Sequence, residues 1–427
     1  MKERLLQFIW QEKFFQLQNL EVETGEQLII RNPGTWNNDQ GPDFLNARIL
    51  LDGTLWAGHI EIHIKSSQWF QHRHETDAAY NNVILHVVWQ NDDRRLADTL
   101  PTLVLQHRVS SLLLSRYQQL MEAGGQFVCE EWLPGIAAGY WLSWKEKLIR
   151  ERLARKAASL LQLYKESNGN WQDSCWWWMA RYMGGTINGA FFEQVAKSLP
   201  TRLLARHKKQ VIQLEAMLLG QANLLDHSNA DAYVQLLQRE YAFLRHKYQL
   251  TPVHGTLQKL RMRPAAFPEV RLAQLAMLLH QNGFLGSSWL EATHPKELAK
   301  NLAVTANDFW HYHFTLEEVA PYYPKHLGEE MVQQLLINVI VPYVYAAGIY
   351  QQQAALQQKA LNWLKELSAE KNTLIKQWQR AGVSCHSAME SQALLELKHS
   401  YCQAKNCLDC AIGQSILNQS GGIVPPD

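Results

Sequence analysis

The sequence predicts an N-terminal α/β domain over residues 1–109, an all-helical body over residues 110–380 and a cysteine-rich C-terminal clamp over residues 381–427 packed on that body. Apolar residues alternate with a period of two up to about residue 109 and recur at spacings of three and four beyond it, which are the periods of strands and helices. Four of the six cysteines lie in the last 43 residues. The length of 427 residues and the 47% hydrophobic content exclude a disordered or collagen-like chain.

The first domain is predicted to contain a helix, three strands, a helix and a strand, followed by one more strand. The expected ranges are a helix over 1–16, strands over 27–31, 44–51 and 55–65, a helix over 69–80, and strands over 83–89 and 102–106. Asp52-Gly53 predicts a tight hairpin turn between the second and third strands. The strand at 83–89 is almost wholly apolar, which is typical of a strand buried on both faces.

Beyond Ser110, long windows of helix formers alternate with Gly and Pro breakers, and no strand is predicted. Residues 1–110 carry 10 Lys and Arg against 14 Asp and Glu, and the remaining residues carry 31 against 26. An acidic site beside a basic body suits a metal-assisted enzyme with an anionic substrate, although such small differences are also typical of solvated surface.

Neither a secretory signal nor a membrane span is predicted. Charged residues interrupt the first twelve positions. The longest apolar run, Ile337–Tyr350, contains Asn338 and Pro342 and is shorter than the roughly 20 residues that a span needs. We therefore expect a cytoplasmic protein that has no membrane partner.

The third strand carries a row of ionisable side chains. In residues 58–65, the three isoleucines point to one face, and His59, Glu61, His63 and Lys65 point to the other. One interpretation is a sheet with one solvated face. The other is a functional site, because helices of an α/β unit cover both faces and buried ionisable groups are costly unless they bind something.

Further polar residues are expected near this row. Asp43 begins the neighbouring strand, and the candidate surrounding residues are His72, His74, Asp77, Tyr80 and His86. Carboxylates from adjacent strands can hold Mg²⁺ or Mn²⁺ against a phosphate, so Asp43 and Glu61 are candidate metal ligands. A Lys or His beside them can stabilise a transition state, which makes His63 and Lys65 candidate catalytic residues.

The order of elements, with Pro42-Asp43 on one strand and Glu61-Ile62-His63 on the next, resembles the PD-(D/E)XK, or restriction-endonuclease-like, nucleases. This resemblance covers about residues 1–107 and implies a Mg²⁺-dependent nuclease. The sequence departs from the pattern because His63 stands where family members usually have Lys, and Lys65 lies one pleat further along the same face. The whole chain also resembles an uncharacterised bacterial family to which no function is assigned.

The hairpin turn determines whether the two carboxylates meet. A two-residue turn at Asp52-Gly53 places Asp43 opposite Ile62, on the wrong face from Glu61. A three-residue loop shifts the pairing by one and places Asp43 opposite Glu61. The apolar pairing favours the two-residue turn, so the site would then require a bend near Pro42.

Two other functions remain open. His72-x-His74, together with His63, His86 or Asp77, is a candidate Zn²⁺ or transition-metal site of a metal-dependent hydrolase or a jelly-roll-like protein. On a regular helix, however, the rings of His72 and His74 would point about 200° apart. The alternative to any enzyme is a noncatalytic nucleic-acid-binding or scaffold protein in which these residues form a hydrogen-bonded core.

The cysteines predict a second metal site. Cys402, Cys407 and Cys410 lie within nine residues, and Cys385 is the expected fourth ligand, which leaves Cys129 and Cys175 outside the site. Four thiolates suit Zn²⁺ or a [4Fe–4S] cluster, and the alternative is a set of reduced thiols packed in a helix.

Nucleic acid is a candidate partner of the helical body. Arg261, Arg263 and Arg271 surround a proline-rich segment, where their guanidinium groups could bind phosphates. Pairing with carboxylates of neighbouring helices is the competing interpretation.

Overall fold

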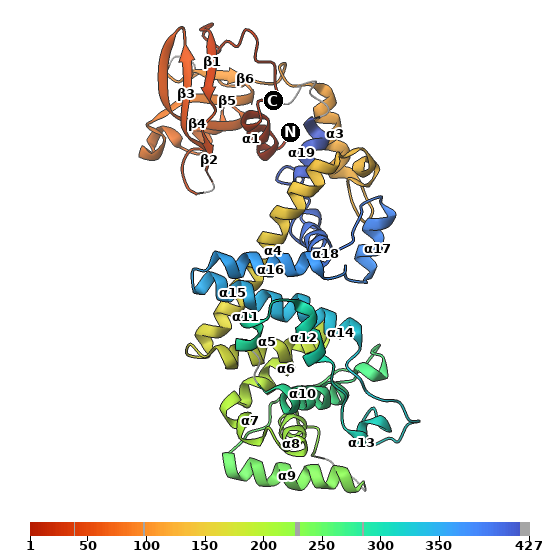
Figure 1. The fold of residues 1–427 in the computed structure, drawn as a ribbon. Helices are drawn as coiled ribbons and strands as arrows, with labels where there is room; N and C mark the ends of the chain where they lie inside the picture. The colour runs from red at the N-terminus through yellow and green to blue at the C-terminus, as the bar shows by residue number, and fades with distance from the viewer. Residues whose placement is uncertain (38, 97–98, 227–230, 284–285, 419–427) are drawn as a thin grey trace. The chain divides into compact units, whose positions relative to one another are not determined.

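A computed structural model of the chain describes residues 1–37, 39–96, 99–226, 231–283 and 286–418 (Figure 1). It divides the chain into two units. The sheet unit contains residues 1–144, 381–383 and the described residues from 397 onward, and the helical unit contains residues 145–380 and 384–396. The units divide after Trp144, and the described residues between 381 and 418 are shared between them.

A six-stranded mixed sheet forms the centre of the sheet unit (Figure 1). Its spatial order is β1-β3-β4-β5-β6, and β2 pairs with β3. The pairs β1–β3, β2–β3 and β3–β4 are antiparallel, whereas β4–β5 and β5–β6 are parallel. The strands are β1 (Leu28–Asn32), β2 (Thr35–Trp36), β3 (Phe44–Leu51), β4 (Thr54–Lys65), β5 (Val83–Gln90) and β6 (Thr102–Val104).

Two local features of the sequence build this sheet. Leu51 pairs with Thr54 across the two-residue turn, and Asp52 and Gly53 have φ values of 44° and 81°, as a turn with two left-handed central residues requires. The first six residues of β5 are all buried, which confirms the prediction of a strand covered on both faces.

Helices cover the sheet and complete its unit. α1 (Glu3–Gln11) packs against β4 and buries six consecutive residues, 5–10. The connection from β4 to β5 contains α2 (Gln68–Gln71) and the 3₁₀ turns η1 (His74–Thr76) and η2 (Ala78–Tyr80). The remaining elements of the unit are α3 (Ser111–Glu122), η3 (Glu130–Gly135), the start of α4 (Ala138–Glu166), the π-helix η6 (Leu397–Cys402) and α19 (Ala411–Asn418).

The helical unit consists of helices in its described residues, and α4 continues into it. Its first helices are α5 (Trp171–Met183), α6 (Gly185–Ser198), α7 (Thr201–His207), α8 (Val211–Gln221), α9 (Ala232–Tyr248), the 3₁₀ turn η4 (Pro264–Ala266) and α10 (Pro268–Asn282). They are followed by α11 (Gly286–Glu291), α12 (Pro295–Leu302), α13 (Asp308–His311), α14 (Glu329–Leu335), the π-helix η5 (Leu336–Ile340), α15 (Val341–Tyr350), α16 (Ala354–Glu366), α17 (Thr373–Arg380) and α18 (Ala388–Glu396).

The apolar helix Glu329–Tyr350 lies in the core of the helical unit. It is long and apolar enough to cross a membrane by length and composition alone. However, 78% of its most apolar 18-residue window is buried inside the structure, as in the core helix of a folded domain.

The predicted fold class is confirmed, because a mixed β-sheet region is followed by a large helical region. The prediction of one continuous helix over 69–80 is wrong. Arg73 adopts a left-handed conformation with φ 61°, and this interrupts the helix after α2.

Candidate functional site

A β-bulge in β3 determines which side chains meet at the centre of the sheet. Ala47 pairs with Gly58, as the two-residue turn requires, but Phe44 pairs with Ile60 because the register shifts by one residue between Phe44 and Ala47. Asn46, inside this shift, has φ 59°, a conformation that Asn tolerates better than most residues. Because of this bulge, the side chains before it point to the opposite face of the sheet from the one that the unshifted register would give.

Asp43 and Glu61 come together through this shift. Extending the Phe44 pairing by one residue places Asp43 opposite Glu61, and the Asp43 backbone N–H donates to Glu61 Oε2 at 3.1 Å. The Asp43 side chain accepts from the Ile62 backbone N–H at 3.0 Å and from Gln7 Nε2 at 2.8 Å. The predicted carboxylate pair thus forms, although a bulge in β3 produces it rather than the expected bend near Pro42.

Glu61 is buried and Asp43 is partly buried, and the nearby Arg4 charge only partly offsets the causes that raise the pKa of Asp43. Burial is the main cause that raises the pKa of Asp43 to about 7, and the nearby Glu3 raises it further. Burial also raises the pKa of Glu61 to about 9, with the Asp43 charge as the second cause. In the described part of the chain no Lys or Arg forms an ion pair with either group. A bound cation would offset this excess of negative charge.

Histidines approach Glu61 from the other side. Glu61 Oε1 lies 3.5 Å from His63 Nε2 and 3.4 Å from His74 Nε2, and His63 Nε2 lies 3.2 Å from His72 Nδ1. One ligand atom from each of His63, His72 and His74 lies within 4.8 Å of the other two. His63 is 1% exposed whereas His72 is exposed, so solvent reaches the group from one side.

The irregular connection after β4 makes the histidine group possible. The left-handed Arg73 between His72 and His74 turns the chain, and the two ring centroids lie 5.3 Å apart. The expectation that these rings would point in opposite directions was derived for a regular helix. It does not apply here because α2 ends at Gln71 and a separate 3₁₀ turn starts at His74.

The buried histidines are neutral, as metal ligands must be. Burial lowers the pKa of His63 to about 2 and that of His86 to about 3, and burial also lowers the pKa of His74. His63 Nδ1 lies 2.9 Å from His86 Nε2. A His63 ring that offers Nε2 to an ion carries its proton on Nδ1, so His86 would fix this tautomer and the ring orientation. His74 Nε2 is buried and has no hydrogen-bond partner among the described residues.

The remaining predicted residues lie around this group or outside it. The Tyr80 ring stacks on His74 with centroids 3.8 Å apart, and burial raises the pKa of Tyr80 to about 12. Asp77 is exposed and accepts from the Ala79 backbone N–H at 2.9 Å, so it caps a turn. The Lys65 side chain is 55% exposed, and its Nζ lies 3.8 Å from Asp92 Oδ2. Lys65 therefore faces solvent, and His63 occupies the interior position.

Two residues of α1 were missed in the sequence. Gln7 is 8% exposed and binds the Asp43 carboxylate, while Glu3 raises the pKa of both Asp43 and Glu61. They are four residues apart and so share one face of the helix. The four-residue spacing of this polar pair was the available signal.

Not all of the three arginines that were predicted to bind nucleic acid are exposed to solvent. Arg261 and Arg263 are exposed, whereas Arg271 is partly buried and donates to Gln274 Oε1 at 2.9 Å.

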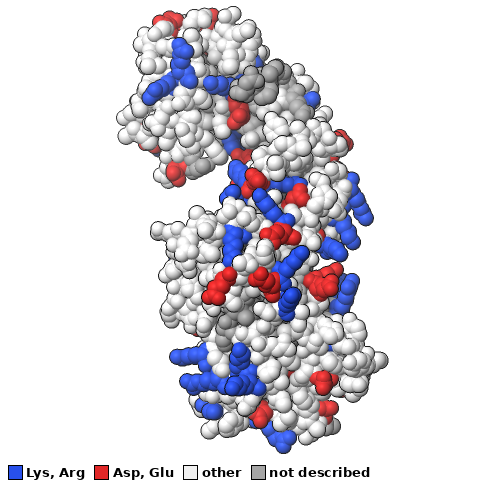
Figure 2. Space-filling model, in the orientation of Figure 1, with Lys and Arg blue, Asp and Glu red and all other residues white. Residues whose placement is uncertain are grey.

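A different basic region lies at α7. A hollow of about 530 Å³ there is lined by Arg202, Arg206 and seven other residues. Figure 2 shows Lys and Arg side chains gathered in this part of the helical unit.

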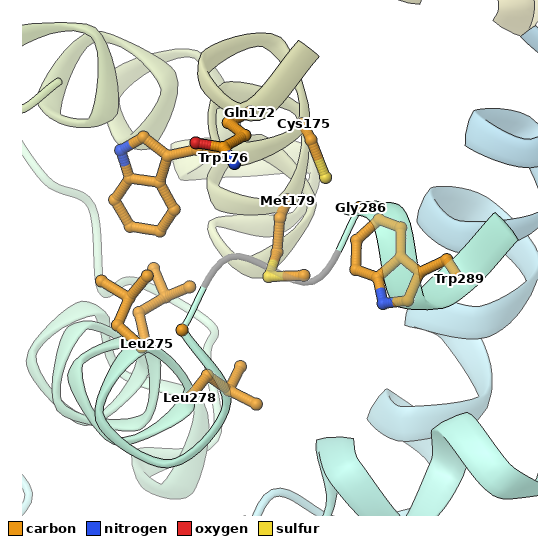
Figure 3. A pocket seen from close by; sticks show the side chains of 10 residues that line it. Gln172, Cys175, Trp176, Met179, Leu275, Leu278, Gly286 and Trp289 are labelled. Carbon is orange, nitrogen blue, oxygen red and sulfur yellow. The ribbon is translucent and has the colours of Figure 1, made fainter. Parts of the chain in front are cut away.

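A separate cavity in the helical unit is unsuitable for a substrate. Figure 3 shows that residues of α5, α10 and α11 line it, including Trp176, Met179 and Trp289. Its volume is about 20 Å³. That is close to the space of one water molecule, and the lining is mostly apolar. The Asp43 and histidine region is therefore the stronger candidate.

The fold and site thus define a mixed-sheet domain with a candidate metal centre, followed by a helical unit. Residues 3–373 match a family model described as "Protein of unknown function (DUF2851)", and the chain belongs to this family. No curated protein and no solved structure matches the chain significantly.

Proposed function

We propose that the sheet unit is a metal-dependent hydrolase that cleaves phosphodiester bonds of nucleic acid. The observation that carries the proposal is the convergence of Glu61 Oε1 with ring nitrogens of His63, His72 and His74. Three imidazoles and one carboxylate are a ligand set for a transition-metal ion such as Zn²⁺, whereas Mg²⁺ prefers oxygen ligands alone. Mn²⁺ also fits if Asp43 adds oxygen ligands. The histidine contribution makes Mg²⁺ a less suitable ion than the sequence suggested.

A bound ion in this position would lower the pKa of a water ligand and polarise a phosphoryl oxygen. The surrounding residues keep the ligands in place. His86 hydrogen-bonds to His63, Gln7 hydrogen-bonds to Asp43, and Tyr80 stacks on His74. Asp43, with a pKa of about 7, is suited to accept or donate a proton near neutral pH.

Phosphodiester substrates are favoured by two further features. Carboxylates from two adjacent antiparallel strands, followed by a parallel crossover strand, are what the nuclease resemblance implies. The basic hollow at Arg202 and Arg206 offers guanidinium groups to phosphates. A noncatalytic scaffold would need neither neutral ligand groups nor a partly solvent-accessible site.

The test is a cleavage assay on the full-length protein. Single-stranded DNA, double-stranded DNA and RNA are each incubated with Mg²⁺, Mn²⁺, Zn²⁺ or Co²⁺. We expect metal-dependent products, and we expect Glu61→Gln and His74→Ala to lose about 100-fold or more of the rate. Lys65→Met is the matched control, because Lys65 lies on the same strand face but points to solvent, and it should retain activity. Cleavage that persists in Glu61→Gln would refute the site assignment, and intact substrates under every condition would favour the scaffold.

The nucleic-acid partner is tested separately by binding. The double variant Arg202→Ala and Arg206→Ala should weaken binding of a fluorescent DNA oligonucleotide and reduce its salt dependence. The double variant Arg261→Ala and Arg263→Ala serves as a control with the same change of charge on exposed side chains. Equal losses in both variants would show that total charge, rather than the hollow, governs binding.

A further inference from the structure

Four cysteines of the sheet unit lie together, and they are not the four that the spacing suggested. Cys129, Cys402, Cys407 and Cys410 are free thiols, and each is an electrostatic neighbour of the other three. Burial raises the pKa of Cys129 to about 12 and that of Cys407 to about 11, and the neighbouring thiols raise both further. Cys385, the predicted fourth ligand, belongs to the helical unit, and the charges that influence its pKa are those of Glu390, Lys145 and Glu370 rather than of another thiol.

Hydrogen bonds join the two distant segments that carry these thiols. Lys398 Nζ donates to the Gln126 carbonyl oxygen at 2.5 Å, and Lys405 Nζ donates to the Met121 carbonyl oxygen at 2.5 Å. These bonds hold the segment that ends at Cys129 against the loop between η6 and α19. Cys129, Cys407 and Cys410 are 9%, 7% and 7% exposed, so the loop closes over them.

The chain around Cys410 is arranged to donate hydrogen bonds to sulfur. Cys410 precedes α19, and its thiol accepts from the backbone N–H groups of Gly413 and Ile412. A Cβ atom on Gly413 would lie 2.1 Å from the Cys407 carbonyl oxygen, so only glycine allows the loop to fold this closely over the helix start. Backbone N–H groups directed at sulfur stabilise a thiolate, and outer hydrogen bonds of this kind tune metal-bound sulfur.

We propose that Cys129, Cys402, Cys407 and Cys410 bind an iron–sulfur cluster, which joins the C-terminal segment to the rest of the sheet unit. Four buried cysteines are the ligand set of a [4Fe–4S] cluster. A single zinc ion would instead draw four sulfur atoms to about 3.8 Å from one another, given Zn–S bonds of about 2.3 Å. Within the described residues, the ligand groups that approach one another within 4.8 Å are the histidines and not these thiols. A cluster fits the wider spacing because each thiolate binds a different iron.

The experiment uses the full-length protein purified without oxygen, with iron, sulfide and zinc measured per chain and the visible absorption recorded. We expect about four irons and four sulfides per chain and a brown colour. Cys129→Ser should lose most of the iron and the colour, whereas Cys385→Ser and Cys175→Ser should retain both. Full iron content in Cys129→Ser would overturn the ligand assignment. About one zinc without iron, or no metal, would overturn the cluster.

A measurement on the wild-type protein covers the case in which Cys129→Ser does not fold. X-ray absorption at the iron edge should show sulfur as the iron ligand together with neighbouring iron atoms. Iron bound only to nitrogen and oxygen would place the metal at the histidine site and refute the proposal. Alkylation followed by mass spectrometry should show that removing iron exposes all four cysteines together. Unchanged labelling of Cys129 would also count against the proposal.

Discussion

Both units bury ionisable side chains, but the groups that surround these side chains differ. In the helical unit the buried Glu396 has basic partners, whereas the buried Glu215 accepts hydrogen bonds from the neutral side chains of Tyr233, Asn307 and Trp310. Glu396 is 3% exposed and accepts from Arg152 Nη1 at 3.1 Å and from Arg155 Nη2 at 2.5 Å. Lys145 pairs with Glu390 at 2.7 Å. Around Glu396 and Glu390 the opposite charges compensate each other, although burial lowers the pKa of the neighbouring Lys156.

The sheet unit places like charges together instead. The Glu3 charge raises the pKa of both Asp43 and Glu61, the Asp43 charge also raises that of Glu61, and the neighbouring His63 is neutral. Such an arrangement lowers the stability of the folded protein unless a cation binds, whereas a compensated network does not need a ligand. The comparison indicates that the network has a structural role and that the carboxylate and histidine site has a functional one.

The same substitution should therefore have opposite effects in the two units. Glu396→Gln leaves Arg152 and Arg155 without a countercharge, and we expect it to lower the free energy of unfolding by about 3 kcal/mol. Glu61→Gln removes a carboxylate that resists ionisation, and without metal we expect it to raise the free energy of unfolding by about 1 kcal/mol. Urea denaturation of each variant measures both effects. A loss of equal size in both variants would contradict the distinction.

Metal ions should stabilise only the sheet unit. At a free Zn²⁺ or Mn²⁺ concentration 100 times the dissociation constant, binding to the folded state adds about 2.7 kcal/mol to the free energy of unfolding. Glu61→Gln should lose most of this gain, whereas Glu390→Gln in the helical unit should keep it. Thermal melting with and without metal measures the effect. Equal stabilisation of wild type and Glu61→Gln would move the metal site elsewhere.

The pH dependence of stability distinguishes Asp43 and Glu61 from the buried histidines. His63 and His86 have lowered pKa values, so their contribution rises with pH only up to the unfolded value near 6.5 and is constant above it. Asp43 and Glu61 have raised pKa values of about 7 and about 9, so from about pH 4 upward the folded state binds more protons than the unfolded state. Stability therefore falls as pH rises, up to about pH 7 for Asp43 and up to about pH 9 for Glu61.

We therefore expect the metal-free protein to lose on the order of 2 kcal/mol between pH 6.5 and 9. The double variant Asp43→Asn and Glu61→Gln should lose clearly less, and urea denaturation at several pH values measures the difference. Metal affinity should rise over the same interval because the ion displaces protons from the carboxylates. A wild-type stability that rises above pH 6.5 would contradict the raised pKa values.

Local sequence patterns were sufficient to predict the strands and the turn that carry the site, but not the register shift that brings Asp43 and Glu61 together. The residue types at Asp52-Gly53 are sufficient to specify a two-residue turn, and the structure has that turn. The bulge at Asn46 was not predictable in the same way, because a left-handed Asn is a minority conformation that packing of the whole sheet selects. Without the bulge, the predicted register would have separated Asp43 from Glu61.

The sequence named His63, His72 and His74 as an alternative metal site, but neither their geometry nor the full set of proposed thiols was predictable, for related reasons. The positions of His72 and His74 depend on one left-handed residue, Arg73, within a segment whose composition favours a helix. Cys129 lies 273 residues before Cys402, and spacing alone cannot connect cysteines that tertiary structure brings together. Spacing did identify Cys402, Cys407 and Cys410, because their proximity is local.

The smallest predicted effect tests whether the bulge, rather than the residues alone, makes the site. Asn46→Val places a β-branched residue at φ 59°, and we expect a loss of about 1–2 kcal/mol in the free energy of unfolding. Asn46→Gly is the control, since glycine adopts this conformation without strain. If the bulge aligns Asp43 with Glu61, Asn46→Val should also weaken metal binding, measured by calorimetry, whereas Asn46→Gly should bind metal like the wild type. Unchanged metal affinity in the valine variant would mean that the carboxylates do not need the bulge in order to meet.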